Sequence, residues 1–268
     1  MTRGSFIAGT VGRSILGVAL LGGLAVPAVA ADLYQPAPVE AAAPTHKLEL
    51  SASVYLTSDY VFRGISQTAE NPALQGSFDM TYNIFYAGVW GSNLDFGGGP
   101  FGQDIANIEI DYYAGITPSW GKWSFDIGGI YYTYPGAYDP GAQFDYFELR
   151  TGVSRSFGEK FSIGVTNYWA PENFGETGNN DVVEIGASYA FNKVWVFDPS
   201  ISGAYGHQWG EKSEGGVDYD YWNAGLTLGF AEKFAIDVRY WDSNLSGCQM
   251  SGLFSCDERV VGTLKASF

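Results

Sequence analysis

The chain has 268 residues, a length that all-β barrels commonly use for a single domain. Acidic residues outnumber basic ones by 29 to 14, and a net charge of -15 argues against electrostatic binding to nucleic acid, so nucleic acid is not an expected partner. Beyond residue 30 no run of 18 apolar residues occurs, which excludes a helical membrane protein.

The first 30 residues have the organisation of an export signal. Arg3 and Arg13 supply the positive region, and an apolar core follows that is too short to span a bilayer. Small residues at Ala28 and Ala30 form a cleavage site. We therefore predict a signal peptide over residues 1–30 and export from the cytoplasm of a Gram-negative bacterium.

Residues 31–46 are rich in proline and alanine, a composition that favours an extended tether over a packed core. We predict a periplasmic linker here, followed by the folded domain over residues 47–268.

From Lys47 onward the hydrophobic pattern has a period of two. In residues 48–57 leucine, alanine and valine alternate with polar residues and tyrosine, and the same alternation recurs at 107–116, 161–166 and 222–230. This period is typical of β-strands with one face in each of two environments.

The connections between these strands alternate in length along the chain. Short turns are expected near residues 83–84, 118–121, 157–160, 192–195 and 231–233, and long glycine-rich or acidic loops near 58–71, 97–105, 135–142, 171–180, 209–217 and 245–257. Outer-membrane barrels have short turns at one end and long loops at the other. The fold class predicted is therefore an all-β, transmembrane, antiparallel up-and-down β-barrel of about twelve strands, although Pro199 blurs the ninth.

Aromatic residues gather at the ends of the expected strands. Those beside the short turns are Trp120, Trp123, Phe157, Phe161, Phe191, Trp195, Phe230 and Phe234. Those at the loop ends are Tyr131, Tyr132, Tyr134, Tyr168, Trp169, Tyr219, Tyr221, Trp222, Tyr240 and Trp241. We interpret them as two aromatic belts at the two membrane interfaces.

The segment LTSDYVFRGISQTAENPALQGSFD at residues 56–79, followed by YAGVWGSNLDF at 86–96, resembles the TorF family. This proteobacterial group contains exported, porin-type proteins long described as conserved and hypothetical. The run from Ser58 to Gly76 is the specific part, with Tyr60, Arg63, Gly64, Gln67, Pro72, Ala73 and Gln75 in the expected order. The resemblance implies a barrel and a pore, without a known substrate or catalytic residues. The C-terminal Phe268 likewise resembles the signal that the barrel-assembly machinery reads.

If the apolar face points outward, the opposite face lines the lumen. The candidate pore-lining residues are Arg63, Glu109, Asp111, Asp126, Glu148, Arg150, Glu184, Asp237, Arg239 and Lys265. So many charges indicate a wet lumen, because unpaired charges in a dry core cost several kcal/mol each. The carboxylates would favour cations. Alternatively Glu148, Arg150, Asp237 and Arg239 form internal salt bridges that brace or plug the barrel.

Arg63 lies in a predicted loop and precedes Gly64, which can fold the loop back and direct the arginine into the mouth of the barrel. The alternative is a pairing of Arg63 with Asp59 or another loop carboxylate that fixes the loop.

Cys248 and Cys256 are the two cysteines, and an oxidising periplasm favours a disulfide between them. No metal site is expected, because the two histidines are distant in sequence from the cysteines. No cofactor and no catalytic residues are expected either. His207 is an odd number of residues from Ser200 and Ser202, so strict alternation puts it on the opposite face of its strand.

The function predicted from these features is an outer-membrane channel for small hydrophilic solutes or ions, with a mild preference for cations. Its partners would be outer-membrane lipid and lipopolysaccharide, the barrel-assembly machinery and the solutes themselves. The alternative is a structural or surface-interaction barrel with an occluded lumen; a lipid hydrolase using His207 is a third possibility. The oligomeric state does not follow from the sequence.

Overall fold

The computed structural model describes residues 47–97, 105–138, 143–246 and 255–268. The predicted signal peptide (1–30) and linker (31–46) lie outside these residues. In the part of the chain that the structure describes, no helix has the length and apolar character needed to cross a membrane.

The described residues form antiparallel strands and one short 3-10 helix. The elements are β1 (Leu48–Thr57), β2 (Val61–Phe62), β3 (Ile65–Ser66), β4 (Ala73–Tyr82), β5 (Phe85–Asn93), β6 (Ile108–Ile116), β7 (Ser119–Trp120), β8 (Trp123–Thr133), β9 (Tyr146–Phe157), β10 (Phe161–Ala170), β11 (Asn180–Ala190), β12 (Phe197–Gly210), η1 (Lys212–Glu214), β13 (Tyr219–Phe230), β14 (Phe234–Ser243) and β15 (Arg259–Ser267).

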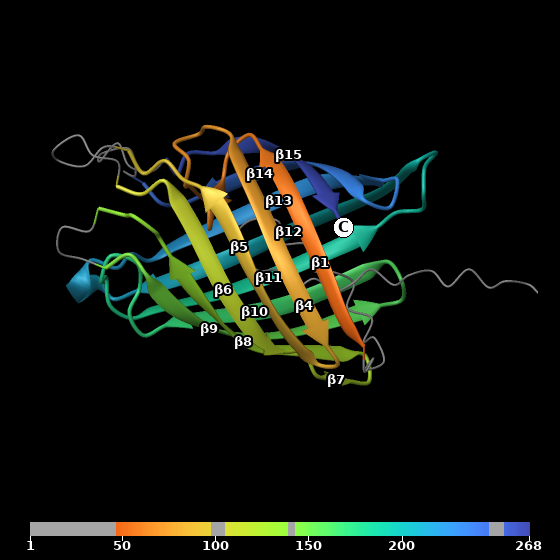
Figure 1. Ribbon diagram of the computed structural model, residues 1–268, viewed down its shortest axis with the longest axis horizontal. Coiled ribbons are helices and arrows are strands. Elements are labelled where there is room, and N and C mark those ends of the chain that lie inside the picture. Colours follow the sequence, from red (N-terminus) through yellow and green to blue (C-terminus); the bar gives the residue numbers. More distant parts are fainter. Residues whose placement is uncertain (1–46, 98–104, 139–142, 247–254) are drawn as a thin grey trace, which may run out of the picture.

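Twelve long strands close into a barrel, as expected from the sequence (Figure 1). Each strand pairs with its neighbours in the chain, and β1 pairs with β15 to close the ring, with Ser53 opposite Ser267. The backbone groups of Phe268 and Ala52 exchange two hydrogen bonds at this seam. Closure leaves no unpaired barrel edge, which a β-structure needs in lipid. Strand β7 extends the turn between β6 and β8.

The short turns and long loops alternate as predicted. All the short turns, including the β11–β12 turn, lie at one end of the barrel, and the long loops lie at the other (Figure 1). The blurred ninth strand is β12, a 14-residue strand that accommodates Pro199 opposite Leu228.

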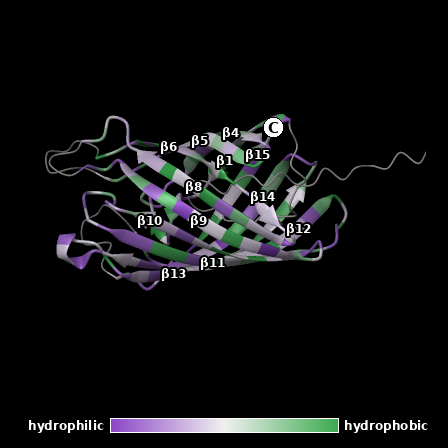
Figure 2. Cartoon of the chain, turned by 90° about the horizontal axis from the view of Figure 1, so that it is seen from below, coloured by the Kyte–Doolittle hydropathy of each residue, from purple (hydrophilic) through white to green (hydrophobic). Residues whose placement is uncertain are grey.

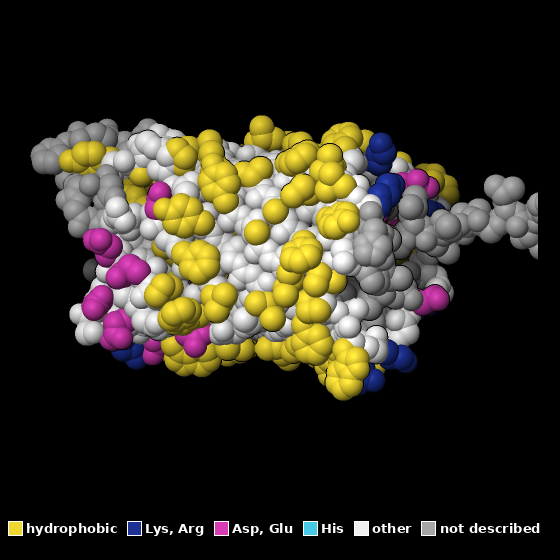
Figure 3. Space-filling view, turned by 60° about the horizontal axis from the view of Figure 1, so that its bottom comes forward, with side chains coloured by type: hydrophobic (Ala, Val, Ile, Leu, Met, Phe, Trp, Pro, Cys, Tyr) yellow, Lys and Arg dark blue, Asp and Glu magenta, His cyan; other side chains and the backbone are white. Residues whose placement is uncertain are grey.

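The outward face is apolar along the strands. Leu50, Leu56 and Leu74 are exposed over more than half of their surface. Hydrophobic and hydrophilic residues alternate along the strands (Figure 2). On the face shown in Figure 3 apolar side chains are spread over the outer wall, whereas carboxylates gather mainly at the loop end. This distribution is that of a transmembrane barrel with a lipid-facing surface.

The prediction of two aromatic belts is correct at the turn end and half wrong at the loop end. At the turn end Trp123, Phe157 and Phe161 face outward. At the loop end Tyr131, Trp169 and Tyr240 also face outward, whereas Tyr132, Tyr134, Tyr168, Tyr219, Tyr221 and Trp241 point inward. Neighbouring residues of a strand occupy opposite faces, so paired aromatics cannot all join one belt. The inward rings occupy the loop half of the lumen.

Candidate functional site

The charged residues predicted from alternation are on the inner wall. Two of them, Asp126 and Lys265, are partly exposed. The others are buried or nearly so: Glu109, Asp111, Glu148, Arg150, Glu184, Asp237 and Arg239. The wall is therefore charged, but much of it is covered by other parts of the chain. The wet lumen stays a prediction, since most of these wall charges are buried in the described conformation.

The segment between β1 and β4 folds into the barrel as a hairpin, which we call the inner hairpin (residues 58–71). Strands β2 and β3 pair through Val61 with Ser66 and Phe62 with Ile65, leaving Arg63 and Gly64 at the tip. Both tip residues have positive φ, +50° and +81°. This is the pattern of a type I′ turn, in which a non-glycine residue such as Arg63 is strained.

The tip of the inner hairpin reaches the far wall of the barrel. Arg63 donates two parallel hydrogen bonds to Glu148 of β9, from Nη1 to Oε1 and from Nη2 to Oε2, both at 2.8 Å. Gly64 lies so close to β13 and β14 that an added Cβ would be 3.0 Å from the Cβ of Ser243 and 3.1 Å from that of Tyr221. The hairpin thus crosses the lumen from β1 and β4 to the opposite side.

Arg63 is held by aromatic rings as well as by the carboxylate. Its guanidinium lies 4.6 Å from the ring centre of Phe62 on the hairpin and 5.0 Å from that of Tyr168 on β10. The Tyr132 hydroxyl donates to Glu148 Oε2 at 3.0 Å. Arg63 therefore points into the barrel, as one sequence-based interpretation expected, and pairs with a wall carboxylate instead of Asp59.

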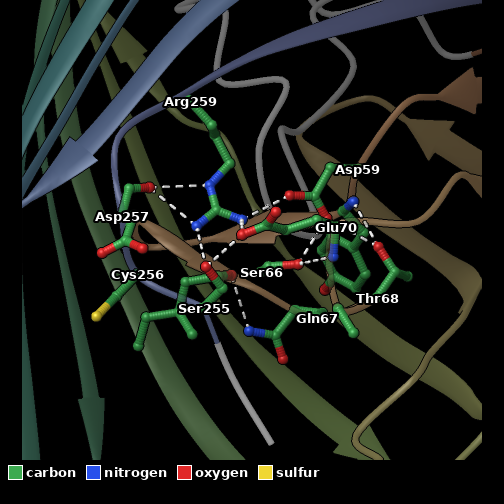
Figure 4. Close-up of polar contacts among 12 residues, drawn as sticks. Asp59, Ser66, Gln67, Thr68, Glu70, Ser255, Cys256, Asp257 and Arg259 are labelled. Atoms are coloured by element: carbon green, nitrogen blue, oxygen red, sulfur yellow. Dashed lines mark hydrogen bonds and ion pairs between the residues drawn. The ribbon is translucent and has the colours of Figure 1, made fainter. Parts of the chain in front are cut away.

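A second ion pair holds the base of the inner hairpin (Figure 4). Arg259, at the start of β15, donates from Nη1 to Asp59 Oδ2 at 2.8 Å. Asp59 Oδ1 accepts hydrogen bonds from the hydroxyls of Ser66 at 2.7 Å and Thr68 at 2.8 Å. The backbone N–H of Ser66 donates to the carbonyl of Ser255 at 2.8 Å. Both ends of the hairpin are thereby fixed to the barrel.

A large aromatic cluster fills the space around the hairpin. Its buried aromatic members are Tyr60, Tyr86, Trp90, Phe96, Tyr113, Tyr132, Tyr134 and Tyr146. Tyr132 stacks on Tyr146 at 4.5 Å, and Phe144 stacks on Phe174, which comes from another long loop, at 4.8 Å. Loops and wall therefore pack together at this end of the barrel and occupy much of the loop half of the lumen.

Two further wall arginines are paired near the middle of the barrel. Arg150 lies 2.7 Å from Asp126, which also accepts a hydrogen bond from Tyr86 at 2.8 Å. Arg239 contacts Asp237 through two nitrogens at 3.2 Å. Arg239 also donates to Asn223 at 2.6 Å and to the Ser202 hydroxyl at 2.9 Å. These contacts match the internal salt bridges of the alternative interpretation. The sequence did not single out Asp126 as the partner of Arg150, nor Arg63 as the partner of Glu148.

A small cavity lies beside the base of the hairpin. A cavity of about 20 Å³, lined by Asp59, Tyr60, Arg239 and Trp241 among others, separates its base from the wall. A space of ~10–15 Å³ holds one water molecule, so this cavity admits water and no larger solute.

Asp111 differs from the paired carboxylates. It is fully buried, and neither carboxylate oxygen has a hydrogen-bond partner. The charged groups that act on it electrostatically, Glu109 and Glu148, are both repulsive. Glu109 is satisfied by the hydroxyls of Tyr60 at 2.9 Å and Tyr134 at 3.2 Å. The loop half of the lumen thus keeps an excess of carboxylates even with Arg63 in position.

His207 lies on the outer face of β12, where its Nδ1 is 2.7 Å from Asp220 and its ring packs on Trp209 at 4.2 Å. Ser202 is in the lumen beside Arg239, so this serine and His207 occupy opposite faces, as alternation predicts. Among the described residues no group of three His, Cys, Asp or Glu side chains has a geometry that could hold a metal ion. Cys256 is half of a disulfide, whereas Cys248 lies outside the described residues, so their pairing stays a prediction.

The sequence interpretation did not identify Tyr132 and Tyr168 as parts of this site, since it assigned them to an outer belt. The signal that would have found them is parity. Tyr132 is separated by an even number of positions from the inward Asp126 on β8. Tyr168 is separated in the same way from the inward Thr166 on β10.

A family model described as "Bacterial protein of unknown function (Gcw_chp)" matches residues 41–268. No curated protein matches the sequence. Among solved structures, a KdgM porin has a TM-score of 0.54 at 8% identity, covering 81% of this chain and 98% of that chain. A NanC porin has a TM-score of 0.50 at 8% identity, covering 82% and 99%. At these identities the likeness concerns the fold alone.

Proposed function

This chain belongs to the Gcw_chp family, and we propose that it is an outer-membrane channel for passive diffusion of small hydrophilic solutes or ions. The observation that carries the proposal is the polar inner wall of a closed twelve-stranded barrel. Near the turns this wall carries small hydroxyl side chains such as Ser53, Ser124 and Ser162. A barrel of this size is wider than the eight-stranded barrels whose side chains fill the interior.

The balance of charge on the wall favours cations. Inward carboxylates outnumber the wall's basic groups, and each of Arg150 and Arg239 is already paired with a carboxylate. Fixed negative charge in a narrow lumen raises the local concentration of cations. One of the similar solved structures is a KdgM porin in complex with disordered oligogalacturonate. At 8% identity that solute is not transferred to this chain.

In this proposal the described conformation is the closed state of the channel. The inner hairpin and the aromatic cluster fill the loop half, while the turn half keeps its polar lining. Opening requires the hairpin tip to leave Glu148.

A specific observation favours a second function, that of a structural or surface-interaction barrel. The hairpin is fixed at both its tip and its base, by the Arg63–Glu148 and Asp59–Arg259 ion pairs. A permanently plugged barrel would act through its acidic loops, and the solutes would never cross it.

Planar-bilayer recording of the refolded mature protein distinguishes the two functions. The wild type is compared with a variant in which residues 61–66 are replaced by a short Gly-Ser linker. We expect discrete conductance steps in the wild type and a much higher open probability in the variant. A permanently plugged barrel would conduct in the variant only. No steps in either protein would refute the channel.

The remaining assignments are proposals of the same kind. We propose cleavage of the signal peptide after Ala30, a periplasmic linker up to residue 46 and outer-membrane insertion read from Phe268. We also propose lipopolysaccharide as a partner of the acidic loops and membership of the TorF group for residues 47–268. No catalytic activity is proposed; hydrolysis of lipid that disappears in His207→Ala would contradict this.

A further inference from the structure

We propose that the inner wall carries a binding site for a guanidinium group, formed by Glu148, Tyr132 and Tyr168. In the described state Arg63 of the inner hairpin occupies this site as a tethered ligand. Free solutes bearing a guanidinium group would compete with Arg63 for it. The role of such solutes in opening and crossing the channel rests on the proposed function; the binding site itself does not.

The carboxylate of Glu148 has the geometry of a guanidinium receptor. Its two oxygens accept two parallel N–H bonds of 2.8 Å, and its side chain is fully buried. The Tyr132 hydroxyl donates to Oε2 from the neighbouring strand and holds the carboxylate in this orientation. Such a fork-to-fork pair is specific for a planar guanidinium, because a rounded ammonium group cannot make both bonds in one plane.

An aromatic face completes the site. The ring centre of Tyr168 is 5.0 Å from the guanidinium carbon of Arg63, within the range of a cation–π contact. Glu148 and Tyr168 both belong to the barrel wall, on β9 and β10. The two elements that recognise a guanidinium therefore remain in place if the hairpin withdraws, and Phe62 alone leaves with it.

Further carboxyl groups surround the site. Asp111 is fully buried with both carboxylate oxygens unpartnered, and Glu184 is buried with one hydrogen bond from Tyr221 at 2.9 Å. Removal of Arg63 would leave Glu148 buried with the hydrogen bond from Tyr132 but without its balancing cation. Uncompensated buried charge is strongly unfavourable, so the vacant site would favour any cation of matching shape.

A guanidinium fits this site better than a metal ion does. In the described part of the chain no group of three carboxylate, histidine or cysteine side chains has metal-binding geometry. A metal ion would also gain nothing from the stacking on Tyr168, whereas a delocalised planar cation does.

The backbone of Arg63 is strained in the described conformation of the hairpin. Arg63 has φ of +50°, a conformation that costs strain for a residue other than glycine. In the wild type a free guanidinium compound can reach Glu148 only when the hairpin withdraws, because Arg63 and the site are buried in the described conformation. Removal of the Arg63 side chain should therefore strengthen the binding of such a compound.

The test is a binding measurement that does not depend on flux. Ethylguanidinium is titrated into refolded, detergent-solubilised Arg63→Ala and followed by intrinsic fluorescence, since Tyr132 and Tyr168 line the vacated site. We expect saturable binding to Arg63→Ala, weaker binding to the wild type, and a loss of about tenfold or more in Arg63→Ala/Glu148→Gln. Ethylammonium, of equal charge, should bind Arg63→Ala about tenfold more weakly than ethylguanidinium.

Equal binding of ethylguanidinium by Arg63→Ala and by the double variant would overturn the site. Equal binding of the two cations would overturn its specificity for guanidinium. If Arg63→Ala does not fold, Arg63→Lys is used, because a lysine ammonium cannot make both parallel bonds to Glu148. Ethylguanidinium should then bind more tightly than it does to the wild type. No gain in affinity would again overturn the site. Binding without conductance in any variant would refute the channel and leave the site standing.

Discussion

Replacement of Glu148 by glutamine should release the inner hairpin from the wall. The side chain keeps its size and one acceptor, but the buried guanidinium of Arg63 loses the charge that balances it and one of its two 2.8 Å bonds. Removal of one partner of a buried ion pair costs about 3–5 kcal/mol. The Glu148 side chain is 0% exposed, so the cost is not reduced by solvent screening.

This cost falls on the closed state, because an open hairpin can return Arg63 to water. A change of about 3 kcal/mol, the lower bound, corresponds to a factor of more than a hundred in the ratio of open to closed channels. The open probability in single-channel recordings should rise accordingly, and limited proteolysis should cleave the inner hairpin sooner than in the wild type.

Glu184→Gln is the matched control. Glu184 is also a buried lumen carboxylate, but it forms no ion pair among the described residues and accepts a hydrogen bond from Tyr221. We expect a much smaller change in open probability for this variant. If Glu148→Gln and Glu184→Gln behaved alike, or if neither changed the protease sensitivity of the hairpin, the tip ion pair would not be what keeps the lumen closed.

Gly64→Ala should destabilise the closed hairpin by about 1–2 kcal/mol more than Gly121→Ala destabilises its turn, measured by protease sensitivity at each site. Both glycines have positive φ, but only at Gly64 would an added Cβ meet other side chains, those of Ser243 and Tyr221 on the barrel wall, so equal effects would contradict the close approach. Arg259→Ala should loosen the base of the hairpin and raise the open probability less than Glu148→Gln does, since the tip contacts persist; a larger rise would mean that the base is the principal lock. Mass spectrometry should find the peptide containing Cys248 and Cys256 lighter by two hydrogen atoms before reduction than after it, and two free thiols in the exported protein would contradict the disulfide.

The strand pattern was predictable because alternation is a local property. Leu48 to Thr57 shows its two faces in ten consecutive residues, and β12 alternates in burial from Ile201 to Trp209. The turns were predictable for the same reason, since each is marked by the residues that form it.

The loop-end belt failed because aromatic composition was considered without parity. Tyr131 and Tyr132 are adjacent in sequence, yet one faces lipid and the other stacks on Tyr146 inside the barrel. Strict use of the two-residue period would have assigned Tyr132 to the lumen, as it did for Glu148 and Arg150.

The sequence by itself determined a closed barrel, its strands and which charged side chains face inward, because lipid on one side and polar groups on the other impose a period of two on every strand. Only the tertiary structure decided what those charges do. Arg63 and Glu148 are 85 residues apart, and a turn with positive φ at Arg63 brings them together across the lumen. The loop that carries Arg63 has no period to reveal that it lies inside the barrel, since its position depends on partners from β9, β10 and β15.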